Sequence, residues 1–317
     1  MLMSSNNTAQ WLRERDNFLV FTHQRPDGDA LGSAAGLCQG LRDAGKTAFV
    51  LPNPEATKTY IEYVSEYYAP ESFECCHVVT VDTASEGQFQ INAGKYLGRV
   101  DLCIDHHPSN TGYAGITCLE SDRAACGEIV YDILSNMDIA ISPKNATALY
   151  VALATDTGCF CYGNTNSKTL ITAAKLIELG VQNGRINKEL FRTKSKIRLK
   201  LEAEIISQME FYSEDTIGIA TLTQKMLQHT GARPEDIEDI AALPGQVQGV
   251  NVAVTLQEQF DGTTKISVRT SRQVNANDIC QRLGGGGHSM AAGCRVTASP
   301  GDAKIQILKV IEDIWVK

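Results

Sequence analysis

The feature that most constrains this chain is residues 18–36, where an apolar run passes through a polar turn into a series of small residues. The apolar run predicts a buried strand, and the small residues that follow predict a helix. The turn between them holds one imidazole and two carboxylates, from His23, Asp27 and Asp29. Like charges crowded in this way are unfavourable unless a cation lies among them, and a bound metal ion is the usual cation. The turn therefore predicts one half of a metal site.

Strands and helices alternate through the first half of the chain. Strands are predicted over residues 17–23, 47–51, 77–81, 100–104 and 116–120, and helices over residues 30–44, 55–68, 124–136, 145–156 and 166–180. This order indicates a larger α/β domain with a mostly parallel sheet flanked by helices, whose ligands gather at the carboxyl ends of the strands. The polar residues at predicted strand ends are His23, Asp27, Asp29, Asp82, Asp105, His106 and His107. Solvated loop charge alone explains this common placement poorly.

The second half is predicted to be a smaller, mixed α/β domain. Its strands are expected over residues 216–221, 250–257 and 264–270, and its helices over residues 234–242, 277–283 and 301–314. Before it, residues 185–212 concentrate Lys and Arg on a helical pattern, and a solvated helix face explains this charge as well as a substrate-facing role does. We expect a metal-binding catalytic domain over residues 1–186, a helical linker over 187–212 and a substrate-binding domain over 213–317.

Composition limits the partners that such a chain can have. The formal net charge is −8, which argues against a broad basic face that coats long duplex nucleic acid. A short or mononucleotide substrate is still allowed, because a metal centre supplies local positive charge. Oligomeric state is left open, with a homodimer as the commonest assembly.

The ten cysteines indicate a reducing compartment. They include an adjacent pair, Cys75 and Cys76, and a C-x-C pair, Cys159 and Cys161, but no C-x2-C pair. The polar N-terminal residues 1–16 do not resemble a signal peptide, and no apolar run approaches the ~18 residues of a membrane span. A cytoplasmic protein with reduced thiols and no membrane association is expected.

The acidic and histidine residues suit two divalent cations. Asp82, the Asp105–His106–His107 triplet and Asp156 add ligands to those of the first turn. Carboxylate-rich sites with one or two imidazoles favour Mn²⁺ or Mg²⁺. Two such ions, with one aspartate between them, best serve hydrolysis of a phosphate ester or anhydride.

Each of these residues also has a plainer interpretation. A lone aspartate such as Asp29 or Asp156 is most often a helix N-cap. Asp105 can orient a metal-bound imidazole without touching a metal. The adjacent pair His106 and His107 is more specific, because neighbouring side chains point to different sides, so that one can face the metals and the other the substrate.

A second group of candidate residues lies near the end of the chain. The glycine run 284–287 is followed by His288 and by small residues, and its backbone N–H groups can approach an anion closely. A flexible loop is the alternative, and four glycines alone would favour it. Arg269, Ser271 and Arg272 end a predicted strand nearby, and arginine binds phosphate in a bidentate manner.

These motifs together resemble the DHH phosphoesterase superfamily. The matching residues, in the family's order and at comparable spacing, are His23, Asp27, Asp29, Asp82, Asp105, His106, His107 and Asp156. Arg269 and the run from Gly285 to Gly293 look like a DHHA1 domain, so the resemblance covers roughly residues 10–315. Length and ending are most similar to the stand-alone oligoribonuclease (nano-RNase) and pAp phosphatase branch.

The resemblance implies a role for each residue. His23 and Asp27 would bind one Mn²⁺, and Asp29, His106 and Asp156 would bind a second. Asp82 would bridge the two ions, and His107 would contact the scissile phosphate or assist the leaving group. The second domain would hold the terminal phosphate of the substrate through Arg269, Ser271, Gly286, Gly287 and His288.

The expected activity is hydrolysis of short oligoribonucleotides and dinucleotides such as pApA and pGpG, of 3′-phosphoadenosine 5′-phosphate (pAp), or of both. A phosphodiesterase for intact cyclic dinucleotides and a single-strand exonuclease of the same superfamily are the alternatives within this class. An inorganic pyrophosphatase ranks lower, because such an enzyme is expected to have a cationic second domain in place of the glycine-rich ending. A non-catalytic nucleotide sensor is the alternative of another class, and a sensor is expected to have lost ligands that this chain keeps.

Overall fold

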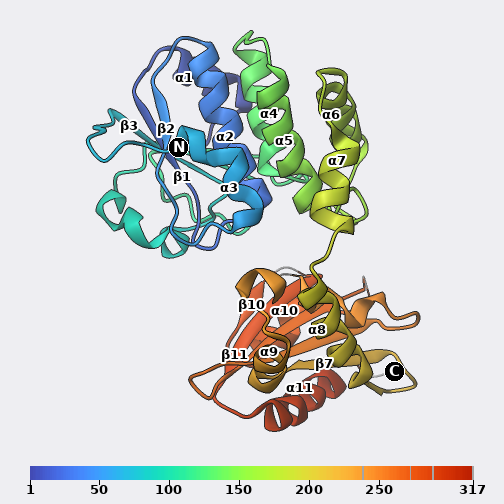
Figure 1. Cartoon of the computed structure of the whole chain (residues 1–317). Coiled ribbons are helices and arrows are strands. Elements are labelled where there is room, and N and C mark those ends of the chain that lie inside the picture. The colour runs from blue at the N-terminus through green and yellow to red at the C-terminus, as the bar shows by residue number, and fades with distance from the viewer. Residues whose placement is uncertain (238, 272, 288, 316–317) are drawn as a thin grey trace. The chain divides into compact units, whose positions relative to one another are not determined.

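The computed structural model describes residues 1–237, 239–271, 273–287 and 289–315. The chain divides into two compact units, Met1–Thr193 and Lys194–Lys317, which are described separately below (Figure 1).

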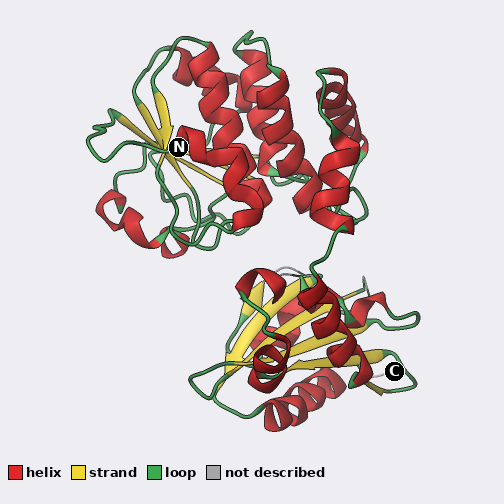
Figure 2. Cartoon of the chain, in the orientation of Figure 1, coloured by secondary structure: helices red, strands yellow, loops and turns green. Residues whose placement is uncertain are grey.

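The first unit is built on a five-stranded, all-parallel sheet with the strand order β2-β1-β3-β4-β5 (Figure 2). Its strands are β1 (Phe18–Phe21), β2 (Ala48–Val50), β3 (His77–Val81), β4 (Leu102–Asp105) and β5 (Ile116–Leu119). β1 is buried along its whole length, as expected for a strand covered on both faces. Phe18 and Val20 face one hydrophobic core, whereas Leu19 and Phe21 face another.

The helices of this unit and one 3₁₀ turn contribute to the core on one face of this sheet, and the segments that hold the other two 3₁₀ turns contribute to the core on the opposite face. The helices are α1 (Ser5–Arg13), α2 (Gly28–Asp43), α3 (Lys58–Val64), α4 (Cys126–Asn136), α5 (Pro143–Asp156), α6 (Ser167–Glu178) and α7 (Asn183–Asn187), the last followed by a π-helical turn, η4 (Lys188–Arg192). The 3₁₀ turns are η1 (Ser65–Tyr67), η2 (Glu86–Gln88) and η3 (Ile91–Tyr96). Residues of η3 complete the core on the second face.

The small residues of α2 let it lie directly against α5. A Cβ atom at Gly32 would stand 2.5 Å from the carbonyl oxygen of Ala148, so that only glycine permits this approach. The contact brings the start of α2, which carries Asp29, close to the end of α5, which carries Asp156.

The second unit holds a six-stranded mixed sheet with the order β10-β11-β9-β8-β7-β6. Its strands are β6 (Glu210–Tyr212), β7 (Ile217–Leu222), β8 (Val252–Glu258), β9 (Thr264–Thr270), β10 (Gly286–Gly287) and β11 (Ala291–Val296). Among the described strand pairs of this second sheet, only β7–β8 is parallel. Its helices are α8 (Lys196–Ser207), α9 (Gln224–Thr230), α10 (Ala276–Gln281) and α11 (Pro300–Ile314), with 3₁₀ turns η5 (Pro234–Ile237), η6 (Ile240–Ala242) and η7 (Pro244–Gln246).

The predicted fold class is confirmed, with differences at particular elements. The helix α1 was not predicted, nor was the strand β11, whose small residues carry little apolar pattern. The helix predicted over residues 234–242 is wrong in type, because the described residues there form the 3₁₀ turns η5 and η6. Asp239, which lies between the two turns, has a backbone φ of 57°, a left-handed conformation that a continuous α-helix cannot contain.

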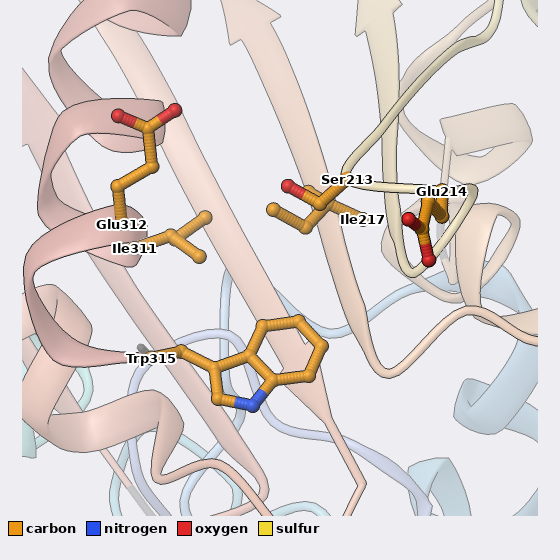
Figure 3. A pocket seen from close by; sticks show the side chains of 6 residues that line it. All are labelled: Ser213, Glu214, Ile217, Ile311, Glu312 and Trp315. Carbon is orange, nitrogen blue, oxygen red and sulfur yellow. The ribbon is translucent and has the colours of Figure 1, made fainter. Parts of the chain in front are cut away.

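Three further observations bear on function. All ten cysteines are free thiols. Across the described part of the chain, we find no helix with the length and apolar character that a membrane crossing requires. The second unit has a cavity of about 180 Å³ lined by Ser213, Glu214, Ile217, Ile311, Glu312 and Trp315 (Figure 3). None of these lining residues belongs to the predicted site.

Candidate metal centre

The turn after β1 supplies the first part of the cluster. Asp27 is the N-cap of α2, and its Oδ1 accepts a hydrogen bond from the Ala30 amide at 3.0 Å. His23 places Nδ1 2.6 Å from the carbonyl oxygen of Gln24. Because a carbonyl can only accept, Nδ1 carries a proton, and Nε2 is the nitrogen that would bind a metal ion. That Nε2 lies 3.6 Å from Oδ2 of Asp82.

Asp29 is buried, with 1% of its surface exposed, and is held from three directions. Its Oδ1 accepts from the Ser33 hydroxyl at 2.9 Å and from the Gly127 amide at 3.0 Å, and its Oδ2 accepts from the Cys126 amide at 2.7 Å. These two amides open α4, whose own N-cap residue, Ala125, provides no side-chain cap. Asp29 therefore caps a helix other than its own, which fixes the orientation of its carboxylate.

Asp82 occupies the centre of the cluster. It follows β3 with a backbone φ of 53°, a left-handed conformation that costs a residue other than glycine free energy and that collects at functional sites. The Asp82 amide donates to the Ile104 carbonyl at 2.9 Å, so the neighbouring strand holds it in place. Its side chain is 3% exposed, and its buried Oδ1 has no hydrogen-bond partner.

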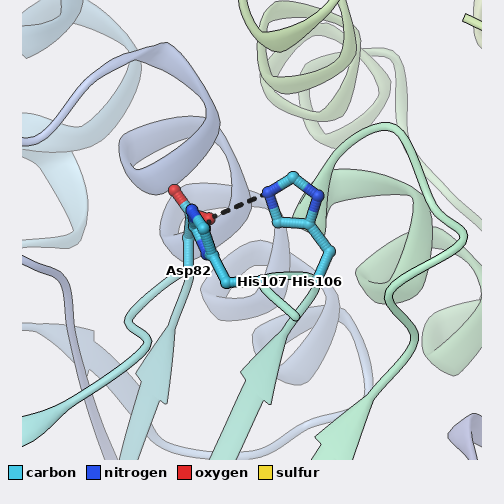
Figure 4. Close-up of side chains that lie close together, drawn as sticks. All are labelled: Asp82, His106 and His107. Atoms are coloured by element: carbon cyan, nitrogen blue, oxygen red, sulfur yellow. Dashed lines mark ion pairs between the residues drawn. The ribbon is translucent and has the colours of Figure 1, made fainter. Parts of the chain in front are cut away.

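The two histidines that follow β4 face Asp82 from different positions (Figure 4). His106 Nε2 lies 3.4 Å from Oδ1 of Asp82, and also 3.8 Å from Asp29 and 3.7 Å from Asp156. His107 Nδ1 lies 2.7 Å from Oδ1 of Asp105 and 3.5 Å from Oδ1 of Asp82.

Asp105 acts as the support of this pair. It is fully buried, and its Oδ1 also accepts from the amides of His106 and His107, at 2.9 Å and 3.2 Å. Its Oδ2 accepts from the Asn110 side chain at 2.6 Å. With both oxygens used in this way, Asp105 orients imidazole and backbone, which agrees with the plainer of the two interpretations of this residue.

Six side chains from four separate segments thus converge at the carboxyl edge of the sheet. Their ligand atoms form two sets in which all atoms lie within 4.8 Å of one another: His23 with Asp27 and Asp82, and Asp29 with His106 and Asp156. A third set within the same limit joins Asp82 to His106 and His107, so that Asp82 lies between the first two.

The cluster raises the pKa of its acids. Burial and the neighbouring carboxylates of Asp82 and Asp156 raise the pKa of Asp29 well above its ordinary value. Burial, followed by the repulsion of Asp82 and Asp27, raises the pKa of Asp156 to about 7. Without a cation, this group of carboxylates therefore retains protons that exposed acids would lose.

The pKa values of the imidazoles of His23 and His106 are raised as well. Burial lowers the pKa of His23, but the carboxylates of Asp82 and Asp27 outweigh burial and raise it to about 9. Burial likewise opposes the shift at His106, where Asp82, Asp29 and Asp156 raise the pKa to about 11. For Asp82, burial is outweighed by the two imidazoles of His106 and His23, and its pKa is lowered. The electrostatic field of the cluster therefore favours positive charge. In the absence of a metal ion, protons on the imidazoles and carboxyl groups supply that charge.

The residues predicted to bind substrate lie in the second unit. Arg269 is an exposed residue of β9 directly opposite Ala291 of β11, and Ser271 donates to the Asn251 side chain at 3.1 Å. Gly286 and Gly287 form the edge strand β10, whose Gly287 amide donates to Oδ1 of Asn277 at 3.0 Å. His288 and Arg272 lie outside the described residues.

The glycine run has a structural reason as well as a functional interpretation. A Cβ atom at Gly285 would overlap the carbonyl oxygen of Gly293 and the Cys294 side chain. Gly287 has a φ of 151° and lies against Ala292 in the same way. Close packing of β10 on β11 therefore requires these glycines, whatever else their N–H groups bind.

Several supporting residues were missed by sequence reasoning. Ser33 follows Asp29 by four residues, a helical spacing that would have identified it. Asn110, Arg123, Cys126 and Gly127 act through tertiary contacts, and nothing in their local sequence indicates them.

Comparison with known proteins assigns the chain to a class of hydrolases that act on phosphoester bonds. Residues 17–155 match the family model described as the DHH family, N-terminal domain, and residues 217–317 match the DHHA1 domain. The chain belongs to the DHH/DHHA1 family of phosphoesterases.

Individual relatives agree with this assignment. The bifunctional oligoribonuclease and PAP phosphatase NrnA of Thermus thermophilus is 30% identical over 277 residues, which span 86% of this chain and 82% of that protein. The crystal structure of an exopolyphosphatase-related protein from Bacteroides fragilis superposes with a TM-score of 0.88 at 22% identity, over 98% of this chain and 96% of that one. The exonuclease RecJ bound to manganese gives a TM-score of 0.53 at 13% identity, over 97% and 94%. These two structures share the fold.

Proposed function

We propose that this chain is a manganese-dependent phosphoesterase that hydrolyses short oligoribonucleotides and dinucleotides of the pApA and pGpG type to mononucleotides, and pAp to AMP. The observation that carries the proposal is the pair of ligand sets, His23 with Asp27 and Asp82 and Asp29 with His106 and Asp156, on either side of one buried aspartate. Two such sets are what a two-metal phosphoester hydrolase requires.

The substrate class is supported by the relatives. The Thermus thermophilus protein, at 30% identity over most of both chains, is named for oligoribonuclease and PAP phosphatase activities. The net charge of −8 favours short substrates over long duplexes, because long polyanions are attracted by broad basic faces. Ten free thiols are typical of a reducing compartment and support a cytoplasmic location.

The residues present fit two divalent cations. The buried Oδ1 of Asp82 has no hydrogen-bond partner, although buried carboxylate oxygens are normally bonded or coordinate metals. In the proposed site, His23 and Asp27 would hold one ion, Asp29, His106 and Asp156 the other, and Asp82 both. Bound there, the ions would polarise the phosphoryl group and neutralise its charge. Carboxylate and imidazole donors suit Mn²⁺ and also admit Mg²⁺, and the manganese bound to RecJ favours the first.

The protein's own groups supply orientation and proton transfer. The carboxylate of Asp105, fixed by two amides and Asn110, accepts a hydrogen bond from Nδ1–H of His107 at 2.7 Å. This bond directs Nε2 of His107 to the scissile phosphate or the leaving oxygen. In the second unit, Arg269, Ser271 and the amides of Gly286 and Gly287, together with His288, would bind the terminal phosphate.

A substrate panel tests the proposal. Metal-free protein supplied with Mn²⁺ is incubated with pAp, pApA, pGpG, cyclic di-AMP and RNA from a 2-mer to a 24-mer. The Asp82→Asn variant serves as the inactive form, and Asp138→Asn, at a side chain that is 92% exposed, serves as the matched control.

The expected result is rapid release of mononucleotides from the shortest RNAs, release of AMP from pAp, and loss of both activities in Asp82→Asn alone. Preference for cyclic di-AMP or for the 24-mer would instead support a cyclic-dinucleotide phosphodiesterase or a single-strand exonuclease. Binding of pApA without turnover would support the sensor and contradict the proposal.

A further inference from the structure

Arg123 lies between β5 and α4 and is surrounded by acids. Its Nε is 2.9 Å from Oε2 of Glu120, its Nη1 is 3.6 Å from Oε2 of Glu128, and its Nη2 forms an ion pair with Asp132. The side chain is only 12% exposed, and that of Glu128 is fully buried. One planar guanidinium thus joins the segment that leaves the sheet to the first two turns of α4.

The main chain of Arg123 contacts a predicted metal ligand. Its carbonyl oxygen lies 3.1 Å from Nδ1 of His106. Since a carbonyl only accepts, Nδ1 of His106 carries a proton, and Nε2 is the nitrogen that faces Asp29, Asp82 and Asp156 and would bind a metal ion. This is the way in which outer groups set the tautomer and the ring plane of histidines that bind metals.

The helix that Arg123 anchors contacts a second predicted ligand. Asp29 accepts hydrogen bonds from the Cys126 and Gly127 amides at the start of α4. Gly127 is required there, because a Cβ atom would stand 2.5 Å from that of Ala152 on α5. The position of this helix end therefore determines where the Asp29 carboxylate points.

We propose that Arg123 is a positioning residue for the Asp29–His106–Asp156 set, an inference that rests on the proposed metal centre. The guanidinium holds residues 120–128 in the one arrangement in which the carbonyl meets His106 and the helix amides meet Asp29. Arg123 does not itself touch metal or substrate.

The charges of the group formed by Arg123, Glu120, Glu128 and Asp132 indicate that this group does more than stabilise the fold. Three carboxylates surround one cation, and neither carboxylate oxygen of Glu128 has a hydrogen-bond partner. An arrangement of this kind gives weak or no net stability compared with apolar packing. It does specify geometry, because a guanidinium presents five donors in a fixed plane. Lysine would keep the charge but could not span Glu120, Glu128 and Asp132 together.

The test is the Arg123→Lys variant, with Arg198→Lys as the matched control. Arg198 is likewise 12% exposed, and its Nε lies 2.6 Å from Glu202 in the second unit. Manganese affinity is measured by electron paramagnetic resonance on metal-free protein, next to thermal unfolding without metal, and kcat and KM for pApA at limiting and saturating Mn²⁺.

Arg123→Lys is expected to bind one of the two Mn²⁺ ions, the one held by the Asp29–His106–Asp156 set, at least about tenfold less tightly. Its kcat should fall at limiting metal and recover at high metal, with KM for pApA unchanged, while Arg198→Lys keeps wild-type affinity. Equal manganese affinity in wild type and Arg123→Lys would overturn the inference, and a loss of thermal stability without a change in affinity would show a purely structural role.

Two further measurements keep the result decisive. If Arg123→Lys fails to fold, Asp132→Asn removes one partner and leaves the buried Arg123–Glu128 pair, and reduced manganese affinity is again expected. If wild-type protein binds no manganese, the proposed function and this inference fall together. If wild type binds two ions and hydrolyses pApA while both variants match it, only the inference about Arg123 fails.

Discussion

Neutralising a predicted ligand should stabilise the metal-free protein while it destroys activity. Asp156 shows the effect most clearly, because burial and the carboxylates of Asp82 and Asp27 raise its pKa from 3.8 to about 7. The folded pKa lies above the unfolded value, so the metal-free protein loses stability as the pH rises from 3.8 to 7 and bears the whole cost above pH 7. The Asp156→Asn variant removes the ionised group responsible for that cost.

The size of the effect follows from the shift. About three pKa units at roughly 1.4 kcal/mol each correspond to about 4 kcal/mol. The side chain is 30% exposed, and solvent screening and burial of the new amide reduce the gain to about 2 kcal/mol. At pH 5 only about a third of the interval between the unfolded and the folded pKa lies below the pH. The stability gained by Asp156→Asn should therefore be less than about 1 kcal/mol at pH 5.

Urea unfolding in the presence of a chelator measures this difference at pH 8 and pH 5, and Mn²⁺ is then added at pH 8. The variant should unfold at higher urea than wild type at pH 8 without metal. Wild type should gain stability on adding Mn²⁺, and the variant should gain less and hydrolyse no pApA. A variant that is less stable than wild type at pH 8, or equally shifted at both pH values, would refute the electrostatic reasoning.

Three further outcomes follow from the same geometry. Asp82→Ala and His107→Ala should each abolish hydrolysis of pApA in Mn²⁺, and near-normal turnover by either variant with an unchanged circular dichroism spectrum would contradict the mechanism. Arg269→Ala should raise KM for pApA and spare a chromogenic phosphoester without a terminal phosphate, whereas equal losses on both would assign the residue another role. Manganese affinity should rise at least about tenfold per pH unit from pH 6 to 8, because His23 and His106, with pKa values of about 9 and about 11, release protons when they bind metal. Calorimetry in two buffers measures the number of protons released. A manganese affinity that does not change with pH would contradict ligation by imidazole.

The parts of the fold that local pattern determines were predictable from sequence. The five strands of the first unit are apolar runs that end in polar turns, and each was found within a few residues of its observed bounds. The small residues after the first turn likewise predicted the helix α2, although not its close packing against α5. The polar helix α1 was missed, although Ser4 caps it and Trp11 and Leu12 are buried in its last turn.

In the second unit, β7, β8 and β9 were predicted, but β6, β10 and β11 were missed because they are short or carry little apolar pattern. β11 is built of residues such as Ala291 and Gly293, which are as common in loops, and its pairing with β9 depends on residues more than twenty positions away. Composition in a short window therefore cannot identify it. The pairing of β10 to β11 similarly gives the glycine run a packing role that its sequence did not show.

The candidate site was predictable in its members and less so in its geometry. The strand-end rule brought His23, Asp82 and His106 to one edge, and the structure brings these side chains together. The helix cap in this region is Asp27 for α2, while Asp29 caps α4, a role that no local rule assigns to a residue in the first turn of another helix. The left-handed backbone conformation of Asp82 also depends on tertiary structure, because the Asp82 amide donates a hydrogen bond to β4.

The most direct test of the account is a count of bound manganese together with turnover. Metal-free protein is titrated with Mn²⁺, the bound metal per chain is measured after equilibrium dialysis, and hydrolysis of pApA is followed in the same samples. The account predicts two ions per chain, with hydrolysis that rises as the second ion binds. Full hydrolysis by chelator-treated protein, or saturation at fewer than two ions in a fully active sample, would contradict it.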